Sequence, residues 1–108
     1  MTFNVHELRR ARGDIASIAR WLADRSPRGA RAWLDSYDDM VNRLKRQADS
    51  YALANEHENF DLDVRQVLFK TKRGRVYRAL FLIDGQDVYI LRVRGPGQAP
   101  VQPDDLGA

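Results

Sequence analysis

The chain has 108 residues, of which 44% are hydrophobic and 31% charged, and it contains no cysteine. This length and composition fit one globular domain and exclude a second domain, extensive disorder, a disulfide framework and a cysteine-bound zinc site. Eighteen Lys and Arg against fifteen Asp and Glu give a net charge of only +3, which does not identify a partner unless the positive charge is concentrated in one place.

The first predicted elements are a short strand and a helix. Apolar and polar residues alternate over residues 3–7, which predicts a strand. Apolar residues then recur at intervals of three and four, which predicts a helix over residues 10–25. Gly13 costs a helix about 1 kcal/mol relative to Ala, so we expect the first turn to fray or the helix to begin at Asp14.

A second helix is predicted to follow after a very short turn. Ser26 can cap the free amides of a helix N-terminus, and Pro27 suits the first helical position. Apolar residues at helical spacing continue to Leu44. Because the turn is short, the two helices are expected to form an antiparallel hairpin. Over residues 47–63 the periodicity weakens and polar residues accumulate, which indicates a connecting loop.

Three strands are predicted in the second half of the chain. Runs rich in β-branched and aromatic residues occupy residues 64–71, 76–83 and 88–93. Arg73-Gly74 separates the first two runs, and Asp84-Gly85 separates the last two. Asp-Gly between two strands is a strong hairpin signal, so the three strands are expected to form an antiparallel meander.

These elements predict an α+β fold of order β-α-α-β-β-β. The helical hairpin is expected to pack on one face of a small, largely antiparallel sheet and to leave the other face open. Residues 1–95 are assigned to this domain. Residues 96–108 are rich in Pro and Gly and are expected to form a tail that stays extended or mobile.

Other features bear on the location of the protein and on its cofactors. No apolar run is long enough for a signal peptide or a membrane-spanning helix, so we expect a cytoplasmic protein without membrane contact. His6 and His57 lie far apart in the sequence and lack the spacing of metal ligands. We therefore expect no metal and no cofactor, and we expect both histidines at the surface.

Basic residues gather around the predicted hairpin of residues 64–83. The candidate target- or nucleic-acid-binding residues are Lys70, Lys72, Arg73, Arg75 and Arg78, with Arg92 and Arg94 from the next strand. Such residues often only solvate a turn and discourage pairing of strand edges. Their convergence from neighbouring strands instead favours a surface that recognises an anionic target. Strand alternation suggests that Arg78 and Lys70 share the open face, whereas Tyr77 falls on the core side with Phe81.

The order of elements and several short motifs resemble the RelE/ParE superfamily of bacterial toxins. The strand runs that carry the resemblance are VRQVLF (64–69), RVYRALF (75–81) and VYILRV (88–93). Further similar pieces are Ala11 with Asp14-Ile15, Arg25-Ser26-Pro27, the stretch YALANEHE (51–58) and the pair Tyr77-Arg78. The resemblance covers about residues 3–94, and its specificity comes from the order of the pieces.

The resemblance implies the toxin of a type II toxin–antitoxin module of the plasmid-stabilisation type. Such toxins inhibit growth and are neutralised by a cognate antitoxin, whose segments wrap the toxin surface. RelE-like members cut mRNA on the ribosome, and ParE-like members inhibit DNA gyrase. Trp21 and Trp33 lie on or near the apolar helical faces, so we expect them in the core or facing the antitoxin.

The resemblance also suggests roles for individual residues. Arg78 matches an arginine that stabilises phosphate charge in RNA-cleaving members, with Lys70 or Lys72 as its partner. Tyr77 is a candidate proton donor, although alternation places it in the core. These three candidate catalytic residues, Arg78, Lys70 and Tyr77, leave enzyme activity undecided, because metal-free RNA cleavage also needs a base and an acid.

The residues after the last strand depart from both branches of the family. RNA-cleaving members carry an arginine and a tyrosine, or a histidine and lysines, there, and gyrase inhibitors often carry a histidine and an arginine. This chain has Gly95-Pro96-Gly97 after Arg94, and no aromatic residue or histidine follows. A gyrase inhibitor needs a binding surface and no catalytic set, so that branch is slightly favoured. The alternatives are a metal-independent mRNA endonuclease and a non-toxic nucleic-acid-binding module or degenerate toxin.

Overall fold

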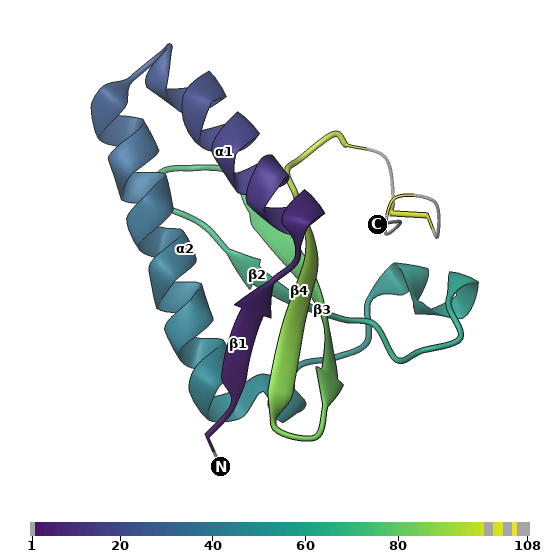
Figure 1. Cartoon of the computed structure of the whole chain (residues 1–108). Coiled ribbons are helices and arrows are strands. Elements are labelled where there is room, and N and C mark those ends of the chain that lie inside the picture. The colour runs from purple at the N-terminus through teal and green to yellow at the C-terminus, as the bar shows by residue number, and fades with distance from the viewer. Residues whose placement is uncertain (1, 99–100, 103–104, 106–108) are drawn as a thin grey trace.

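The computed structural model contains a four-stranded sheet with a helical hairpin against one of its faces (Figure 1). It describes residues 2–98, 101–102 and 105. The elements are β1 (Asn4–Glu7), α1 (Arg9–Ala23), α2 (Pro27–Gln47), β2 (Arg65–Phe69), β3 (Tyr77–Asp84) and β4 (Asp87–Arg94), with the 3-10 helices η1 (Ala48–Ser50) and η2 (Asn55–Asn59). The predicted α+β fold and its order of elements are confirmed.

The strand order is β1-β4-β3-β2, so the first strand of the chain lies beside the last. β1 is parallel to β4, whereas β4, β3 and β2 pair antiparallel. The Asp-Gly turn joins β3 to β4 as predicted, and Gly85 adopts a φ of 62°, which a glycine adopts without strain. The register of the β3–β4 pair shifts between Leu80 and Phe81.

Both helices of the hairpin form, but α1 begins earlier than predicted. α2 begins as expected, because the Ser26 hydroxyl accepts a hydrogen bond of 3.0 Å from the Gly29 N–H and Pro27 holds the first position. α1 begins at Arg9, so the expectation of a frayed first turn or a start at Asp14 is wrong. Ala11 of that first turn is fully buried, and this tertiary packing outweighs the low helix propensity of Gly13.

The main core lies between the helices and the sheet. α2 contributes Trp33, Tyr37, Met40 and Leu44, and the sheet contributes Val67, Phe69, Ala79, Phe81, Val88, Ile90 and Val93. Burial of each large side chain stabilises the fold by about 1.5–3 kcal/mol. At one end of this core the Trp33 ring centroid lies 5.7 Å from that of Phe69 and 5.4 Å from that of Tyr77. The predicted core side of β3 is therefore correct.

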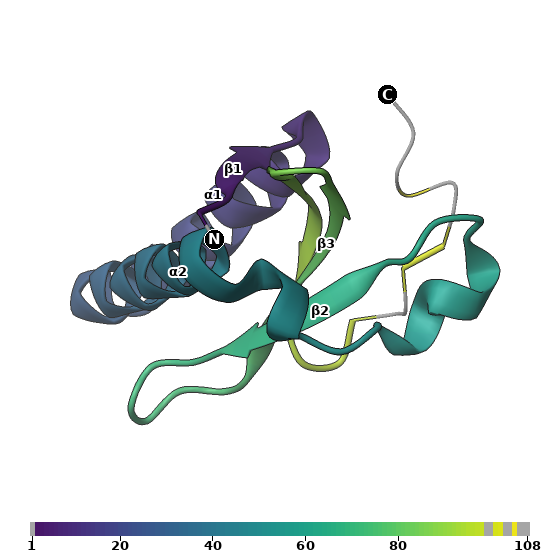
Figure 2. The same ribbon diagram turned by 90° about the horizontal axis from the view of Figure 1, so that it is seen from below.

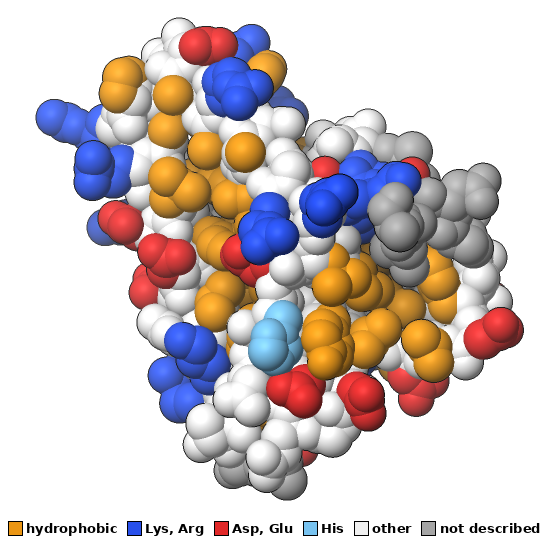
Figure 3. Space-filling view, viewed as in Figure 1, with side chains coloured by type: hydrophobic (Ala, Val, Ile, Leu, Met, Phe, Trp, Pro, Cys, Tyr) orange, Lys and Arg blue, Asp and Glu red, His pale blue; other side chains and the backbone are white. Residues whose placement is uncertain are grey.

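The opposite face of the sheet is covered in part, so the expectation of an open face is correct for only part of that face. Leu80 and Leu91 are buried there, together with Ala54, Val64 and Val101. Figure 2 shows the sheet between the helical hairpin and the segment that contains η2. The physical reason is alternation, which turns the leucines of β3 and β4 away from the helices, where they need their own cover. In Figure 3, apolar side chains of the strands are visible at the surface beside this second core.

The tail takes part in the second core. Val101 is fully buried, so at this position the predicted tail packs against the domain. Residues 99–100, 103–104 and 106–108 of the predicted tail lie outside the described part of the chain. Within the described residues, no helix has both the length and the apolar character needed to cross a membrane.

Candidate functional site

The basic residues that were predicted to form one surface fall into two groups. Lys70, Lys72, Arg73 and Arg75 are exposed in the loop of residues 70–76 between β2 and β3, which we call the basic loop. Arg78, Arg92 and Arg94 are half-buried on β3 and β4, and each forms an ion pair with a carboxylate. None of the ion pairs between described residues involves the basic loop. The seven residues therefore differ in their availability to a ligand.

Arg78 is held by a buried carboxylate. Its two terminal nitrogens donate to Glu56 Oε1 at 2.7 Å and to Oε2 at 2.5 Å, and Gln66 accepts a further hydrogen bond at 3.2 Å. Glu56 is only 3% exposed, and its Oε2 also accepts the Val101 N–H at 3.0 Å. The hydrogen bonds from Arg78 hold the pKa of Glu56 below its usual value, so the carboxylate is charged. Lys70 lies one residue beyond the end of β2.

Arg92 ties β4 to α1 and to the tail. Its guanidinium makes a bidentate pair with Asp14, with Nε–Oδ2 of 2.7 Å and Nη2–Oδ1 of 2.8 Å. Asp14 Oδ2 also accepts the Val93 N–H at 2.9 Å, and Arg92 donates to the Asp105 carbonyl at 2.9 Å. The hydrogen bonds to Asp14 raise the pKa of Arg92. Arg94 lies 3.4 Å from the Asp105 carboxylate. These contacts hold the fold together and neutralise both arginines.

Tyr77 belongs to the aromatic end of the core. Its ring is half-buried against Trp33 and Phe69. A Cβ added to Gly95 would come within 2.7 Å of the Tyr77 ring, so the end of β4 approaches Tyr77 as closely as a glycine allows. This placement agrees with the packed tyrosine that strand alternation predicted.

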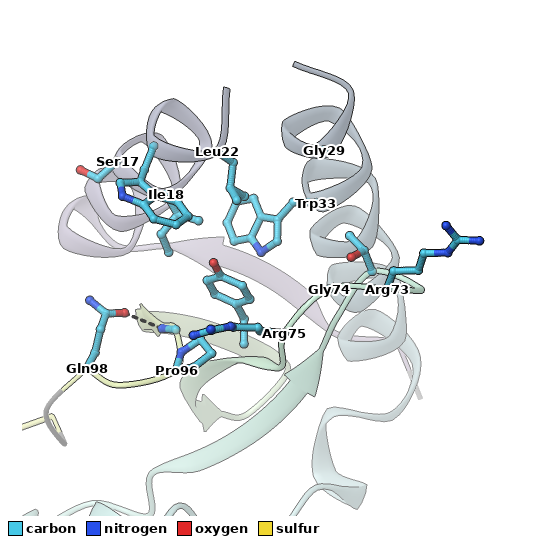
Figure 4. Close-up of a pocket in the computed structure, with 14 residues that line it drawn as sticks. Ser17, Ile18, Leu22, Gly29, Trp33, Arg73, Gly74, Arg75, Pro96 and Gln98 are labelled. Carbon is cyan, nitrogen blue, oxygen red and sulfur yellow. Dashed lines mark hydrogen bonds between the residues drawn. The ribbon is translucent and has the colours of Figure 1, made fainter. Parts of the chain in front are cut away.

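A cleft lies where the helical hairpin meets the basic loop and the end of β4 (Figure 4). It has a volume of about 900 Å³ and is lined by Ile18, Trp21, Leu22, Trp33 and Tyr77, together with Arg73 and Arg75 of the basic loop. In Figure 4 the Arg73 side chain points outward beside α2, and the Arg75 side chain extends toward Pro96. The sequence did not predict this cleft, because it joins residues of four separate segments.

The two histidines, which were expected at the surface, differ in their exposure. His6 is exposed, stacks on Tyr89 with a centroid distance of 5.1 Å and lies 2.9 Å from Asp87. His57 is half-buried in η2. No cluster of three or more His, Asp or Glu residues placed to bind a metal ion occurs in the described part of the chain.

Two carboxylates that organise the arginines were not recognised as such from the sequence. Glu56 lies within YALANEHE and Asp14 beside Ile15, both in stretches that carry the family resemblance. Their partners Arg78 and Arg92 stand 22 and 78 residues away, and no local spacing links them.

Comparisons with known proteins agree with the fold and the motifs. A family model described as the ParE toxin of the type II toxin–antitoxin system parDE matches residues 8–100. Among solved structures, the chain is similar to one from "Chromosomal ParDE TA system from P. aeruginosa", with 20% identity, a TM-score of 0.62 and coverage of 87% of this chain and 96% of that chain. No curated protein matches at a significant level. Because the family model spans α1, α2 and the strands β2, β3 and β4, the protein belongs to the ParE family of type II toxin–antitoxin toxins.

Proposed function

We propose that this toxin inhibits DNA gyrase in the bacterial cytoplasm, that it binds its target through the basic loop, and that a cognate antitoxin neutralises it. Family membership implies the antitoxin partner. The observation that carries the choice of target is the division of the basic residues. Arg78, which resembles an arginine of the RNA-cleaving members, and Arg92 are paired with internal carboxylates, whereas the four cations of the basic loop are exposed.

The ion pairs on β3 and β4 favour binding over cleavage. RNA cleavage requires cations that are free to stabilise charge on the reacting phosphate. Transfer of Arg78 to a phosphate would leave the Glu56 carboxylate buried without its partner, which costs about 3–5 kcal/mol. Tyr77, the candidate proton donor, is packed against Trp33 and Phe69. These contacts support a toxin that acts by occupying a surface of its target.

The basic loop suits recognition of an acidic or nucleic-acid-bound target. Lys70, Lys72, Arg73 and Arg75 stand on one exposed turn, in which the Gly74 N–H donates to the Thr71 carbonyl at 3.3 Å. Clustered positive charge accelerates association with an anionic surface, and this effect weakens as the salt concentration rises.

Induced expression in bacteria tests the proposal. We expect growth arrest, an SOS response and DNA breaks, with rescue by the antitoxin of the adjacent gene. Purified protein should inhibit supercoiling by gyrase, and Lys70→Glu/Lys72→Glu should weaken inhibition by about tenfold or more. The control Arg28→Glu/Arg31→Glu makes the same charge change on the exposed side of α2 and should have little effect.

Two other outcomes would assign a different function. Loss of mRNA within minutes, abolished by Arg78→Ala and without an SOS response, would identify an mRNA endonuclease. Unimpaired growth would refute the toxin, and salt-sensitive binding to nucleic acid would then indicate a non-toxic module.

A further inference from the structure

We propose that the tail carries an autoinhibitory strap, in which the carboxylate of Asp105 occupies an anion-binding site that Arg10, Arg92 and Arg94 form on the domain. The strap consists of Val101, Gln102 and Asp105. An anionic target must displace Asp105 before it can contact these arginines. This proposal rests on the function proposed above, to which it adds a second part of the target-binding surface and a segment that regulates access to it.

The three arginines converge on Asp105 from two elements. Arg92 of β4 and Arg10 of α1 donate to the backbone carbonyl of Asp105 at 2.9 Å and 3.3 Å. Arg94 Nη2 lies 3.4 Å from Oδ2 of the carboxylate, and Arg92 Nη1 lies 3.9 Å from Oδ1. Because positive charges repel one another at such short range, their convergence is stable only around an anion. Asp105 supplies that anion from within the chain.

Two hydrogen bonds hold the carboxylate of Asp105 in position. The Gln102 N–H donates to Asp105 Oδ2 at 2.8 Å, and the Asp105 N–H donates to the Gln102 carbonyl at 2.9 Å. The hydrogen bond from Gln102, followed by the charges of the arginines, keeps the pKa of Asp105 below its usual value. The carboxylate is therefore charged at neutral pH.

The tail is attached to the domain before it reaches Asp105. The Gln98 side chain folds back onto the end of β4, where it accepts the Gly95 N–H (Figure 4). Val101 is fully buried, and its N–H donates to Glu56 Oε2 at 3.0 Å. The Asp105 side chain is 34% exposed, and ion pairs open to solvent contribute little to stability. Asp105 can therefore leave the arginines while Val101 and the domain stay in place.

Release of Asp105 would expose two cations that no internal carboxylate neutralises. Arg92 would keep its bidentate pair with Asp14. Among the ion pairs between described residues, however, Arg94 pairs with Asp105 alone and Arg10 with no carboxylate. The Arg94 Nε–H is also buried without an acceptor among the described residues. Asp105 therefore leaves part of the hydrogen-bonding capacity of the site unused.

The unused donors favour a phosphate group as the competing ligand. A phosphate offers more acceptor oxygens than a carboxylate, and arginines bind it through paired, charge-assisted hydrogen bonds. After a small rotation of the Arg94 side chain, one phosphate could accept from its Nε–H and from Arg10 together. Such a ligand would satisfy donors that Asp105 leaves without an acceptor.

The anion site adjoins the basic loop. Arg94 is the register partner of Arg78 on β3, three residues after Arg75 of the basic loop. In Figure 4 the Arg75 side chain extends toward Pro96, which lies two residues beyond Arg94. A target that binds the basic loop is therefore placed to compete with Asp105.

Binding of inorganic pyrophosphate, followed by NMR, tests the site without gyrase. Asp105→Asn should bind pyrophosphate about tenfold or more tightly than the wild type, because the competing carboxylate is gone. Asp39→Asn is the matched control, since it removes one negative charge from the exposed side of α2 and should bind like the wild type. In the wild type, pyrophosphate should shift the Gln102 amide resonance, because that N–H loses its carboxylate acceptor. Equal Kd values for the three proteins would overturn the strap.

Substitution of the arginines in the Asp105→Asn background tests the site itself. Arg10→Gln/Arg94→Gln should weaken pyrophosphate binding by about tenfold or more. Arg9→Gln/Arg12→Gln removes the same charge from exposed positions of α1 and should change the Kd less than about threefold. Equal effects of the two double substitutions would show that only net charge matters and would overturn the site.

Gyrase and DNA separate the strap from the proposed function. Asp105→Asn should inhibit supercoiling at a concentration about threefold or more lower than the wild type and Asp39→Asn. Equal inhibition by all three would overturn autoinhibition while the toxin assignment stands. No inhibition by any of them, with pyrophosphate bound as expected, would overturn the gyrase target and support the strap. A short DNA duplex should displace pyrophosphate from Asp105→Asn, and failure to do so would assign the site to small phosphate compounds.

Discussion

Replacement of Glu56 by Gln tests whether the buried carboxylate organises the second face of the sheet. Glutamine keeps the size of the side chain but removes its charge, and its amide N–H₂ faces the N–H donors of Arg78 and Val101. Arg78 then loses one of two charge-assisted hydrogen bonds, each of which contributes about 1.5–3 kcal/mol, and the Val101 N–H competes for the remaining oxygen. Because Arg78 is partly exposed and regains some hydration, we expect a loss of about 2–3 kcal/mol.

Urea unfolding at pH 7 measures this loss, and the unfolding midpoint should fall by about 1–2 M. Glu58→Gln is the matched control, because Glu58 is exposed in the same 3-10 helix. The pKa of Glu56 is lowered in the folded state, so its contribution is fully present above the unfolded pKa and is lost as the pH falls through the folded pKa. The difference between wild type and Glu56→Gln should therefore shrink below about pH 4. Equal midpoints at pH 7, or a difference that does not depend on pH, would refute this account of Glu56.

Three further substitutions test other contacts by the same unfolding measurement. Asp14→Asn should lower the free energy of unfolding by about 2–3 kcal/mol, because the bidentate pair with Arg92 is only 13–14% exposed. The loss should be smaller in an Arg92→Met background, and additive effects of the two substitutions would disprove the coupling. Gly13→Ala should stabilise by about 0.5–1 kcal/mol, since the added Cβ meets nothing within 4 Å in a helix interior, and a loss of stability would contradict this. Gly95→Ala should cost about 1–3 kcal/mol, because its Cβ would lie 2.7 Å from the Tyr77 ring; an unchanged midpoint would show that the ring moves freely.

Local signals in the sequence predicted most of the elements correctly. Ser26 and Pro27 begin α2, and the Asp-Gly turn at residues 84–85 joins β3 to β4, because capping and turn formation depend on neighbouring residues. Strand alternation also identified the core side of β3, which carries Tyr77, Ala79 and Phe81. Helix propensity did not predict the start of α1 correctly, because the burial of Ala11 depends on tertiary contacts that propensity ignores.

The cover of the second sheet face could not be predicted by periodicity. Ala54, Val64 and Val101 are single apolar residues at irregular spacing in polar or Pro-rich segments, and no helix or strand pattern groups them. The ion pairs were hidden for a similar reason. Arg78 looked like a free cation because its carboxylate partner Glu56 lies in a segment that appeared to be a solvated loop.

The pairing of β1 with β4 has a consequence for the order in which the toxin forms during synthesis. A side-chain hydrogen bond joins His6 of β1 to Asp87 of the neighbouring strand β4, although 81 residues separate them in the chain. β1 therefore has no strand to pair with until the ribosome has produced nearly all of β4. The carboxylate of Asp14 likewise has no ion-pair partner until Arg92 has been synthesised. Such long-range contacts form slowly and late. A nascent chain that stops before β4 lacks the strand that pairs with β1 and the arginine that pairs with Asp14, so the complete fold can form only after β4 has been synthesised.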